Sequence, residues 1–239
     1  MGVKDLLQAD AGSFGYELAS TKRTGMHYWL DVDRIKPMRS FRTIVDVGAH
    51  HGESALQFVR RAPDAAVFSF EPSAASYERL TANVAALTNV TCIRSAVGSA
   101  PGEVMLYHRT WSQANSLRPP ATGTQTFSPA AGSSERVPIT TLDAFAAERG
   151  LSRIDLLKTD TEGYDVEVLR GASGLLAEGR IDFLYSEVAF DPEDREHTNF
   201  ADLFQYVTAA GLRLLGLYEL AQWPSPWRIA FCNALFTRL

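Results

Sequence analysis

The stretch Thr43-Ile44-Val45-Asp46-Val47-Gly48-Ala49-His50-His51-Gly52 decides the fold of this 239-residue chain. Its first five residues form a β-branched apolar run that ends in valine after an acid, which is typical of a buried strand. Gly48 and Gly52 then frame a turn, and apolar residues recur at helical spacing from Ala55 to Val59. A helix that starts after such a turn has free backbone N–H groups, which attract a carboxylate or phosphate. The stretch therefore predicts a ligand site at the end of the first strand of an α/β fold.

The alternation of strand and helix continues along the chain. Four more apolar runs predict strands, at residues 66–70, 90–97, 154–159 and 181–188. Between them lie helical patterns, of which 73–87 is the clearest, with Ser73 as its cap. This order predicts βαβ units and a mostly parallel sheet.

The C-terminal part predicts a different strand pairing. An amphipathic helix from Phe200 to Val207, closed by Gly211, precedes two predicted strands at 212–220 and 229–237. The connector between these strands is too short for a helical crossover. We therefore expect an antiparallel pair at one edge of the sheet.

Composition limits the classes of protein to consider. With 46% hydrophobic and 21% charged residues, the chain can bury the core of one domain. Its formal charge of −5 gives no reason to expect a nucleic-acid partner, because phosphate binding needs clustered Lys and Arg. No apolar run reaches the roughly 18 residues of a membrane span. Cys92 and Cys232 lie in apolar runs with no Cys or His at metal-ligand spacing, which predicts buried thiols. We expect a soluble cytoplasmic protein without membrane contact, with its oligomeric state, a homodimer included, left open.

Two regions are distinguished within the chain. Residues 43–239 are predicted to form the main domain, and residues 1–42 a helical cap or an extension that faces substrate. The aromatic residues of 1–42 suit both roles, because they pack as readily as they recognise ligands. The tract 111–134 is rich in Pro, Ser, Thr, Ala and Gly without periodicity, which predicts a long loop that could act as a lid.

The glycine turn discriminates among nucleotide ligands. A dinucleotide site needs glycine where His50 stands, because a pyrophosphate approaches the backbone there. A phosphate-binding Walker loop needs Gly-Lys-Ser/Thr, whereas Gly52 is followed by Glu53 and Ser54. S-adenosylmethionine carries no phosphate and needs neither device.

A carboxylate at the end of the second predicted strand supports the same ligand. Glu71 lies 23 positions after Gly48, close to the interval at which nucleoside-binding folds place an acid on ribose hydroxyls, and Pro72 stiffens the chain after it. Asp46 can cap the turn, bind the ammonium of the methionine moiety, or do both. A methyl donor with a ribose is therefore the predicted cofactor.

The chain resembles the FkbM family of methyltransferases from about residue 43 to residue 190. The matching blocks are DVGAHHGES at 46–54, FEP at 70–72, VPITTLD at 137–143, LKTDTEGYD at 157–165 and VLRG at 168–171. The last three are the more specific. Two positions depart from the family: His50, where Asn is frequent, and Thr161, where an aliphatic residue is common; imidazole and amide can both bond to a polar ligand.

The resemblance implies a class I methyltransferase fold. This is a Rossmann-like three-layer α/β sandwich whose seven-stranded, mostly parallel sheet has an antiparallel last strand. The resemblance also implies O-methylation of sugars or of natural-product hydroxyls. In this family a polar segment, here Ser112, Gln113, Asn115 and Ser116, lies beside cofactor and acceptor.

The strand ends define the predicted site, because ligands of open α/β sheets bind beyond the carboxyl ends of the strands. The predicted cofactor set comprises Asp46, Gly48, Ala49, His50, Gly52, Glu71, Pro72, Ser95, Ala96 and Asp160.

Four residues are candidates for the chemistry, which must remove a hydroxyl proton during methyl transfer. Asp160, Glu162 and Glu187 follow strands four and five, where one acid could act as a general base. Alternatively Asp160 and Glu187 could hold a divalent cation such as Mg²⁺. Asp160 and Glu162 could also cap the helix that begins near Gly163. His108 is a secondary candidate base, although a lone strand-end histidine is usually a surface residue.

The sequence thus predicts an S-adenosylmethionine-dependent O-methyltransferase that acts on a hydroxylated small molecule. A nicotinamide-dependent oxidoreductase on a related fold and a non-catalytic cofactor-binding module are the alternatives. No motif identifies the acceptor or the methylated position.

Overall fold

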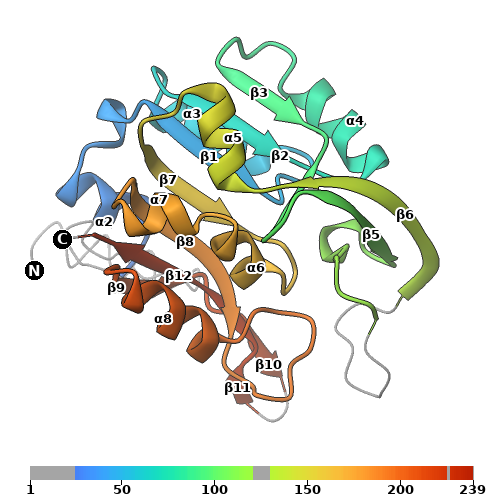
Figure 1. Ribbon diagram of the computed structural model, residues 1–239. Coiled ribbons are helices and arrows are strands. Elements are labelled where there is room, and N and C mark those ends of the chain that lie inside the picture. Colours follow the sequence, from blue (N-terminus) through green and yellow to red (C-terminus); the bar gives the residue numbers. More distant parts are fainter. Residues whose placement is uncertain (1–24, 121–129, 225–226, 239) are drawn as a thin grey trace, which may run out of the picture.

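The computed structural model describes residues 25–120, 130–224 and 227–238 of the chain (Figure 1). Residues 1–24 of the predicted N-terminal cap lie outside these ranges. Among the described residues, no helix combines the length and the apolar character needed to cross a membrane.

A seven-stranded sheet forms the central layer. Its strands are β1 Thr43–Val47, β2 Ala66–Phe70, β3 Val90–Ile93, β7 Ile154–Thr159, β8 Ile181–Ala189, β9 Arg213–Tyr218 and β12 Phe231–Thr237. They are ordered β3-β2-β1-β7-β8-β12-β9. Along this order the first five strands, β3, β2, β1, β7 and β8, pair in parallel. β12 is antiparallel to both β8 and β9. The predicted sheet, with its antiparallel last strand, is confirmed.

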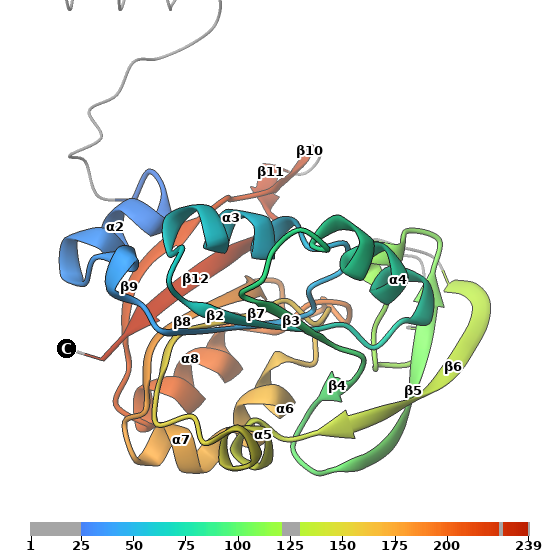
Figure 2. The ribbon, with the colours of Figure 1, turned by 90° about the horizontal axis from the view of Figure 1, so that it is seen from above.

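Helices cover both faces of the sheet (Figure 2). One face carries α2 Tyr28–Ile35, α3 Glu53–Arg61 and α4 Ala74–Asn83, and the other carries α5 Leu142–Arg149, α6 Asp165–Arg170, α7 Ser173–Ala177 and α8 Phe200–Ala209. Successive strand residues enter opposite cores: Ile44 and Leu156 pack on the α2 to α4 side, and Val45 and Leu157 on the other. A strand buried on both faces reads as an unbroken apolar run, which is why the sequence located β1, β2 and β7 well.

The helix before the sheet is tied to its antiparallel edge. Tyr28 of α2 stacks on Tyr185 of β8 with ring centroids 4.0 Å apart. The hydroxyl of Tyr218 donates to Asp31 of α2 at 2.8 Å. A 3₁₀ turn, η1 (Met38–Ser40), then leads into β1.

A second sheet lies beside the carboxyl ends of the central strands. It contains β4 Ala96–Val97, β6 Ala130–Thr140 and β5 Gly102–Arg109, in the order β4-β6-β5. The predicted strand 90–97 is therefore two strands, β3 and β4, which belong to different sheets. A small hairpin of β10 Gln222–Pro224 and β11 Trp227–Ile229 precedes β12.

The prediction of a loop over residues 111–134 is wrong at the C-terminal end of that range. Residues 130–134 belong to β6 and pair with β5, for example Tyr107 with Ser134. These five residues have small side chains and show no apolar alternation of their own. Their place in the sheet comes from the hydrogen bonds to β5. Earlier in the tract, η2 (Ser112–Ala114) forms a 3₁₀ turn; residues 121–129 lie outside the described residues, so the lid expectation is not tested there.

Two helix predictions were right in place but not in every detail. α4 ends at Asn83, four residues before the predicted end, and its cap residue Ser73 makes no side-chain cap hydrogen bond. Instead, the Ser73 N–H donates to Glu71. α8 ends before Gly211, whose φ of +89° suits the predicted closing turn.

Candidate active site

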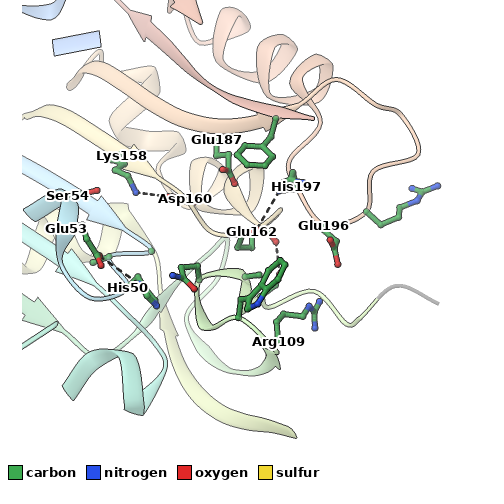
Figure 3. A pocket seen from close by; sticks show the side chains of 18 residues that line it. His50, Glu53, Ser54, Arg109, Lys158, Asp160, Glu162, Glu187, Glu196 and His197 are labelled. Carbon is green, nitrogen blue, oxygen red and sulfur yellow. Dashed lines mark hydrogen bonds and ion pairs between the residues drawn. The ribbon is translucent and has the colours of Figure 1, made fainter. Parts of the chain in front are cut away.

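Two adjoining cavities lie at the carboxyl ends of the central strands. The larger one, about 630 Å³ in volume, contains Asp160, Glu162 and Glu187 in its wall, and we call it the acidic cavity (Figure 3). The second, the apolar cavity, has Val47, Phe70, Val97, Leu106 and Leu117 in its wall, with Glu71 beside them. Both cavities share Gly48, His50, Gln113 and Asp160. The predicted crevice is thus a continuous region with one charged half and one apolar half.

Packing within the protein accounts for the glycines of the turn after β1. A Cβ on Gly48 would lie 1.9 Å from the carbonyl oxygen of Asp160, and one on Gly52 would lie 2.8 Å from Leu80 Cδ1. Both glycines have positive φ, +85° and +92°. His50 between them also adopts a positive φ, of 45°. The turn needs glycine to bring β1 against β7 and α3 against α4, before any ligand is considered.

Glu71 holds this turn in place. Its Oε2 accepts the backbone N–H of His50 and its Oε1 that of Ser73, each at 2.9 Å. Burial raises the pKa of Glu71 to about 7, although the two N–H groups act in the opposite direction. Two donors leave part of the carboxylate's acceptor capacity unused. Glu71 lines the apolar cavity together with Pro72, Ser95 and Ala96, as the predicted cofactor set requires.

Asp46 is turned away from both cavities. It is fully buried, and the ammonium of Lys158 lies 3.5 Å from its Oδ1. Neither carboxylate oxygen has a hydrogen-bond partner among the described residues. Burial raises the pKa of Asp46, while Lys158 lowers it. The structure thus assigns Asp46 to Lys158, and supports neither of its predicted roles as turn cap and cofactor ligand.

Lys158 also binds the first acid of the acidic cavity. Its Nζ is 3.0 Å from Asp160 Oδ2. Burial alone would lower the pKa of Lys158, but the carboxylates of Asp160 and Asp46 raise it above its ordinary value. Asp160 is therefore a charge-paired residue at the boundary of the two cavities.

Glu162 and Glu187 are crowded acids. Burial, followed by the charge of Asp160, raises the pKa of Glu162 to about 8. The same causes, with the charge of Glu162 added, raise the pKa of Glu187 well above its usual range. Glu162 occupies a left-handed backbone conformation, with φ of 52°. Strain of this kind at a cavity wall is typical of functional residues.

The predicted capping role of Asp160 and Glu162 is not observed. α6 begins two residues later than Gly163, and Asp165 supplies the acid of its first turn. The Asp165 carboxylate accepts from the Thr161 N–H at 3.3 Å and from the Thr198 hydroxyl at 2.8 Å. Asp160 and Glu162 take no part in capping this helix, and both line the acidic cavity.

Sequence reasoning missed His197, which faces Glu162 across the acidic cavity (Figure 3). Its Nδ1 lies 2.8 Å from Asp194 Oδ2, and its Nε2 lies 3.9 Å from Glu162 Oε2. Burial would lower the pKa of His197, but the bond to Asp194 and the charge of Glu162 raise it. Its ring stacks on Phe231 at 4.9 Å. The only local sequence signal was an aspartate three positions before it.

The possible cation ligands that the structure brings together differ from the predicted pair, Asp160 and Glu187. Oxygen atoms of Glu162 and Glu187 and a ring nitrogen of His197 lie within 4.8 Å of one another. Asp160 is absent from this group because its carboxylate bonds to Lys158. If the protein holds a cation here, its ligands are Glu162, Glu187 and His197.

His108 lines neither cavity. Its Nε2 is 3.5 Å from Glu135 on the neighbouring strand β6. β5 continues through residue 109, and successive side chains of a strand point to opposite faces, so Arg109 lines the acidic cavity instead. The structure does not support His108 as the base.

The segment from Arg109 to Arg118 forms one wall of the site. The predicted polar residues all lie there: Ser116 lines the acidic cavity, Ser112 and Asn115 the apolar one, and Gln113 both. The Ser116 hydroxyl donates to the backbone carbonyl of Glu162 at 2.6 Å. The imidazole Nε2 of His50 lies 2.9 Å from Ser112 Oγ. These bonds join the wall to the turn after β1 and to the loop after β7.

Comparison with known proteins identifies similar chains. The family model described as the Methyltransferase FkbM domain matches residues 46–214. The 2-O-methyltransferase NoeI of Sinorhizobium fredii is 26% identical over 157 residues, which cover 60% of this chain and 62% of NoeI. Methyltransferase sdnD of Sordaria araneosa is 28% identical over 195 residues, 70% of this chain and 75% of sdnD. The chain therefore spans less than two thirds of NoeI.

Solved structures show the same fold. A methyltransferase FkbM from Methylobacillus flagellatus has a TM-score of 0.54 at 17% identity, covering 83% of this chain and 44% of that one. An rRNA methylase from Streptococcus thermophilus has a TM-score of 0.50 at 12% identity, covering 92% and 99%. These likenesses establish the class I methyltransferase fold that the sequence predicted.

Proposed function

Because this chain belongs to the FkbM methyltransferase family, we propose that it transfers a methyl group from S-adenosylmethionine to a hydroxyl of a small-molecule acceptor. One observation carries the proposal: an apolar cavity of about 50 Å³ with a carboxylate at its side adjoins and shares wall residues with an acidic cavity of about 630 Å³, which has room for a second molecule. Donor and acceptor can then meet at the residues that the two cavities share, Gly48, His50, Gln113 and Asp160.

The lining of the apolar cavity suits the nucleoside part of the donor, although the cavity of about 50 Å³ must widen to hold it. Phe70, Val97 and Leu106 offer apolar surface for a planar base, and the unused acceptor capacity of Glu71 suits the two ribose hydroxyls. Gly48 and Asp160 lie at the passage to the acidic cavity, where the methionine part would extend. When bound, the donor supplies a methyl group on a positively charged sulfur.

The acidic cavity supplies the proton acceptor. We assign this role to Glu162, because its raised pKa makes it a stronger base than an ordinary carboxylate. The acceptor oxygen forms a bond to the methyl carbon as the carbon–sulfur bond breaks, and the hydroxyl proton passes to Glu162. Asp194 holds His197 in place. His197 in turn orients Glu162 and offsets its negative charge, so it is a positioning residue.

A divalent cation is the second candidate for this step. Glu162, Glu187 and His197 offer two carboxylates and an imidazole, and Asp194 on the other ring nitrogen is the kind of partner that orients a metal-bound histidine. A cation there would lower the pKa of the acceptor hydroxyl. Dialysis against a chelator decides between the two: unchanged turnover supports Glu162 as the base, and loss restored by added Mg²⁺ or Mn²⁺ supports the cation.

A small-molecule acceptor with a hydroxyl fits the charge of the site better than a nucleic acid. Glu53 and Glu196 add to the three acids of the cavity wall, and the chain carries a net charge of −5. A nucleic-acid backbone brings many phosphates and requires a basic surface. The name of the relative NoeI, a 2-O-methyltransferase, supports oxygen as the atom that is methylated. We infer a sugar or secondary-metabolite acceptor.

Calorimetry tests the donor assignment. S-adenosylhomocysteine should bind to the wild type and to Glu78→Gln, a control at an exposed position of α4. Glu71→Gln should weaken binding by about tenfold, because a hydrogen bond to a charged acceptor is lost. Absence of binding to the wild type would contradict the proposal, and so would equal affinity of Glu71→Gln. Methyl transfer to a panel of sugars and phenols then tests the acceptor class.

A further inference from the structure

An arginine in the wall of the acidic cavity has no counter-ion among the residues that the structure describes. Arg109 is 6% exposed and lines the cavity near the end of β5. Its Nη2 donates to the carbonyl of Arg118 at 3.2 Å, and its Nη1 has no hydrogen-bond partner among the described residues. No carboxylate of the described residues lies within ion-pair distance of its guanidinium, in contrast to Lys158, which has two.

Such an arrangement is costly unless something else binds there. A guanidinium stays protonated at every physiological pH, and a buried charge without a partner is unfavourable. Most buried donors in proteins are paired, so an unpaired one at a cavity indicates a missing partner. Within the described residues the protein supplies only the carbonyl of Arg118. The planar guanidinium has the geometry for a carboxylate or a phosphate.

The distribution of charge over the cavity restricts where an anion can bind. Glu162 and Glu187 repel a negative group from the part that faces Lys158, whereas Arg109 lies on the other side of Glu162 from Lys158 (Figure 3). A second arginine, the exposed Arg195, lines the same cavity. The cavity wall therefore carries both signs of charge: Glu162 and Glu187 favour a neutral hydroxyl beside them, and the arginines attract a negative group, with Glu196 in the same part of the wall opposing that attraction.

We propose that Arg109 binds an anionic group, a carboxylate or a phosphate, of the acceptor, and so fixes which end of the acceptor faces the methyl donor. This inference rests on the function proposed above. The Nη1 atom is itself covered, so contact requires a small displacement of neighbouring atoms. Arg195 adds attraction at the cavity without being required for the contact.

Titration calorimetry with the protein saturated by S-adenosylhomocysteine tests the inference. The probes are glucose 6-phosphate, glucuronate, neutral glucose and inorganic phosphate. The wild type should bind at least one of the two anionic sugars about tenfold more tightly than glucose, as expected for charge-assisted hydrogen bonds. The comparison of the two anionic sugars identifies phosphate or carboxylate as the preferred group.

Variants then locate the binding group. Arg109→Gln should abolish the preference for the anionic sugar, and Arg109→Lys should retain part of it. Arg136→Gln, at an exposed position of β6, is the matched control and should bind as the wild type does. Circular dichroism and S-adenosylhomocysteine binding verify that each variant is folded. If Arg109→Gln does not fold, the wild type and Arg109→Lys still decide the question.

Three results would overturn the inference: no binding of any anionic probe by the wild type, equal binding of glucose and the anionic sugars, or an undiminished preference in Arg109→Gln. Failure of the proposed function is separate, because it shows as absent S-adenosylhomocysteine binding before any sugar is added. A methyltransferase that binds the donor but prefers neutral acceptors would leave the proposed function intact and refute the role of Arg109.

Discussion

The α-carbon of Gly48 lies so close to the carbonyl group of Asp160 that a Cβ at residue 48 would be 1.9 Å from its oxygen. The contact joins the turn after β1 to the end of β7, where the two cavities meet. It places Gly48, a predicted cofactor-binding residue, in direct backbone contact with Asp160, which lines the acidic cavity. The geometry of both half-sites therefore depends on one glycine.

Gly48→Ala should destabilise the protein and weaken donor binding. The methyl group would meet backbone atoms that have no alternative conformer, and overpacking of this kind costs about 1–3 kcal/mol in addition to the strain of a positive φ. Gly150→Ala is the control, because Gly150 also has a positive φ, +63°, but has open space around its Cβ position. Urea unfolding measures both. Equal losses would show that backbone conformation alone, and not the contact with Asp160, explains the glycine.

Lys158→Met should destabilise the protein by about 3–5 kcal/mol, because it leaves Asp46 buried without a counter-ion. Burial raises the folded-state pKa of Asp46 above its ordinary value of 3.8, so the ionised form is the one that folding disfavours. The deficit should therefore be largest at neutral pH, shrink as the pH falls, and disappear well below 3.8, where Asp46 is protonated in both states.

Two comparisons check the role of this ion pair. Urea unfolding of Lys158→Met at about pH 5 and about pH 7 gives the pH dependence. The double variant Lys158→Met/Asp46→Asn should recover much of the lost stability, because the uncompensated charge is gone. A double variant as unstable as the single one would mean that Lys158 acts through packing or through Asp160.

Glu162→Gln should reduce methyl transfer by about 10² to 10⁴, the usual contribution of a general base, with little effect on donor affinity. The exposed Glu193→Gln in the loop before α8 is the control and should retain wild-type activity. Retention of most activity by Glu162→Gln would exclude this residue as the proton acceptor.

The pH dependence of kcat/KM provides an independent check on Glu162. A base must be ionised, and burial together with the charge of Asp160 raises the pKa of Glu162 to about 8 in the free protein. We therefore expect kcat/KM to rise with pH and to level off above about 8. His197, Asp165 and Glu196 also face Glu162, so Asp194→Asn, which removes the partner of His197, should shift the profile. A profile that is flat between about pH 6 and pH 9 would refute the assignment.

Ser116→Ala should lower kcat more than it raises KM. The Ser116 hydroxyl donates to the carbonyl of Glu162 at 2.6 Å and accepts from the Arg118 N–H at 3.0 Å, so its removal frees the strained backbone of Glu162 and leaves a buried donor unpaired. A cost of about 1 kcal/mol is expected in stability. Thr208→Ala, which removes a hydroxyl that donates to the Phe204 carbonyl in an exposed hydrogen bond of α8, is the control. An effect confined to stability, with kcat unchanged, would show that Ser116 does not position Glu162.

Sequence alone located the central strands because their periodicity and burial agree. β1, β2 and β7 were predicted at their observed limits, since each is an apolar run buried on both faces. The second sheet was harder to predict. Its strand β6 begins among small polar residues that gain their partner only from β5. A segment that depends on a neighbour for its hydrogen bonds carries little local signal.

The residues of the candidate site also divide into those predicted from the sequence and those that only the structure revealed. Gly48, His50, Glu71 and Asp160 were found because their spacing is measured along the chain and their positions follow strand ends. His197 and Arg109 were missed because their importance comes from residues distant in sequence. His197 is distinguished by its ion pair with Glu162, 35 positions earlier, and Arg109 by a buried Nη1 that has no partner among the described residues. Neither relationship leaves a motif.

The sequence by itself thus determined the class I fold, the end of the sheet where the candidate site lies and the family, because hydrophobic periodicity and glycine positions act through neighbours in the chain. Only the tertiary structure decided the charges of the site. It paired Asp46 and Asp160 with Lys158, turned His108 out of the cavity, and brought Glu162, Glu187 and His197 together. Coulomb energies and burial depend on distances through space, and these are set when β7, β8 and the wall after β5 pack against one another.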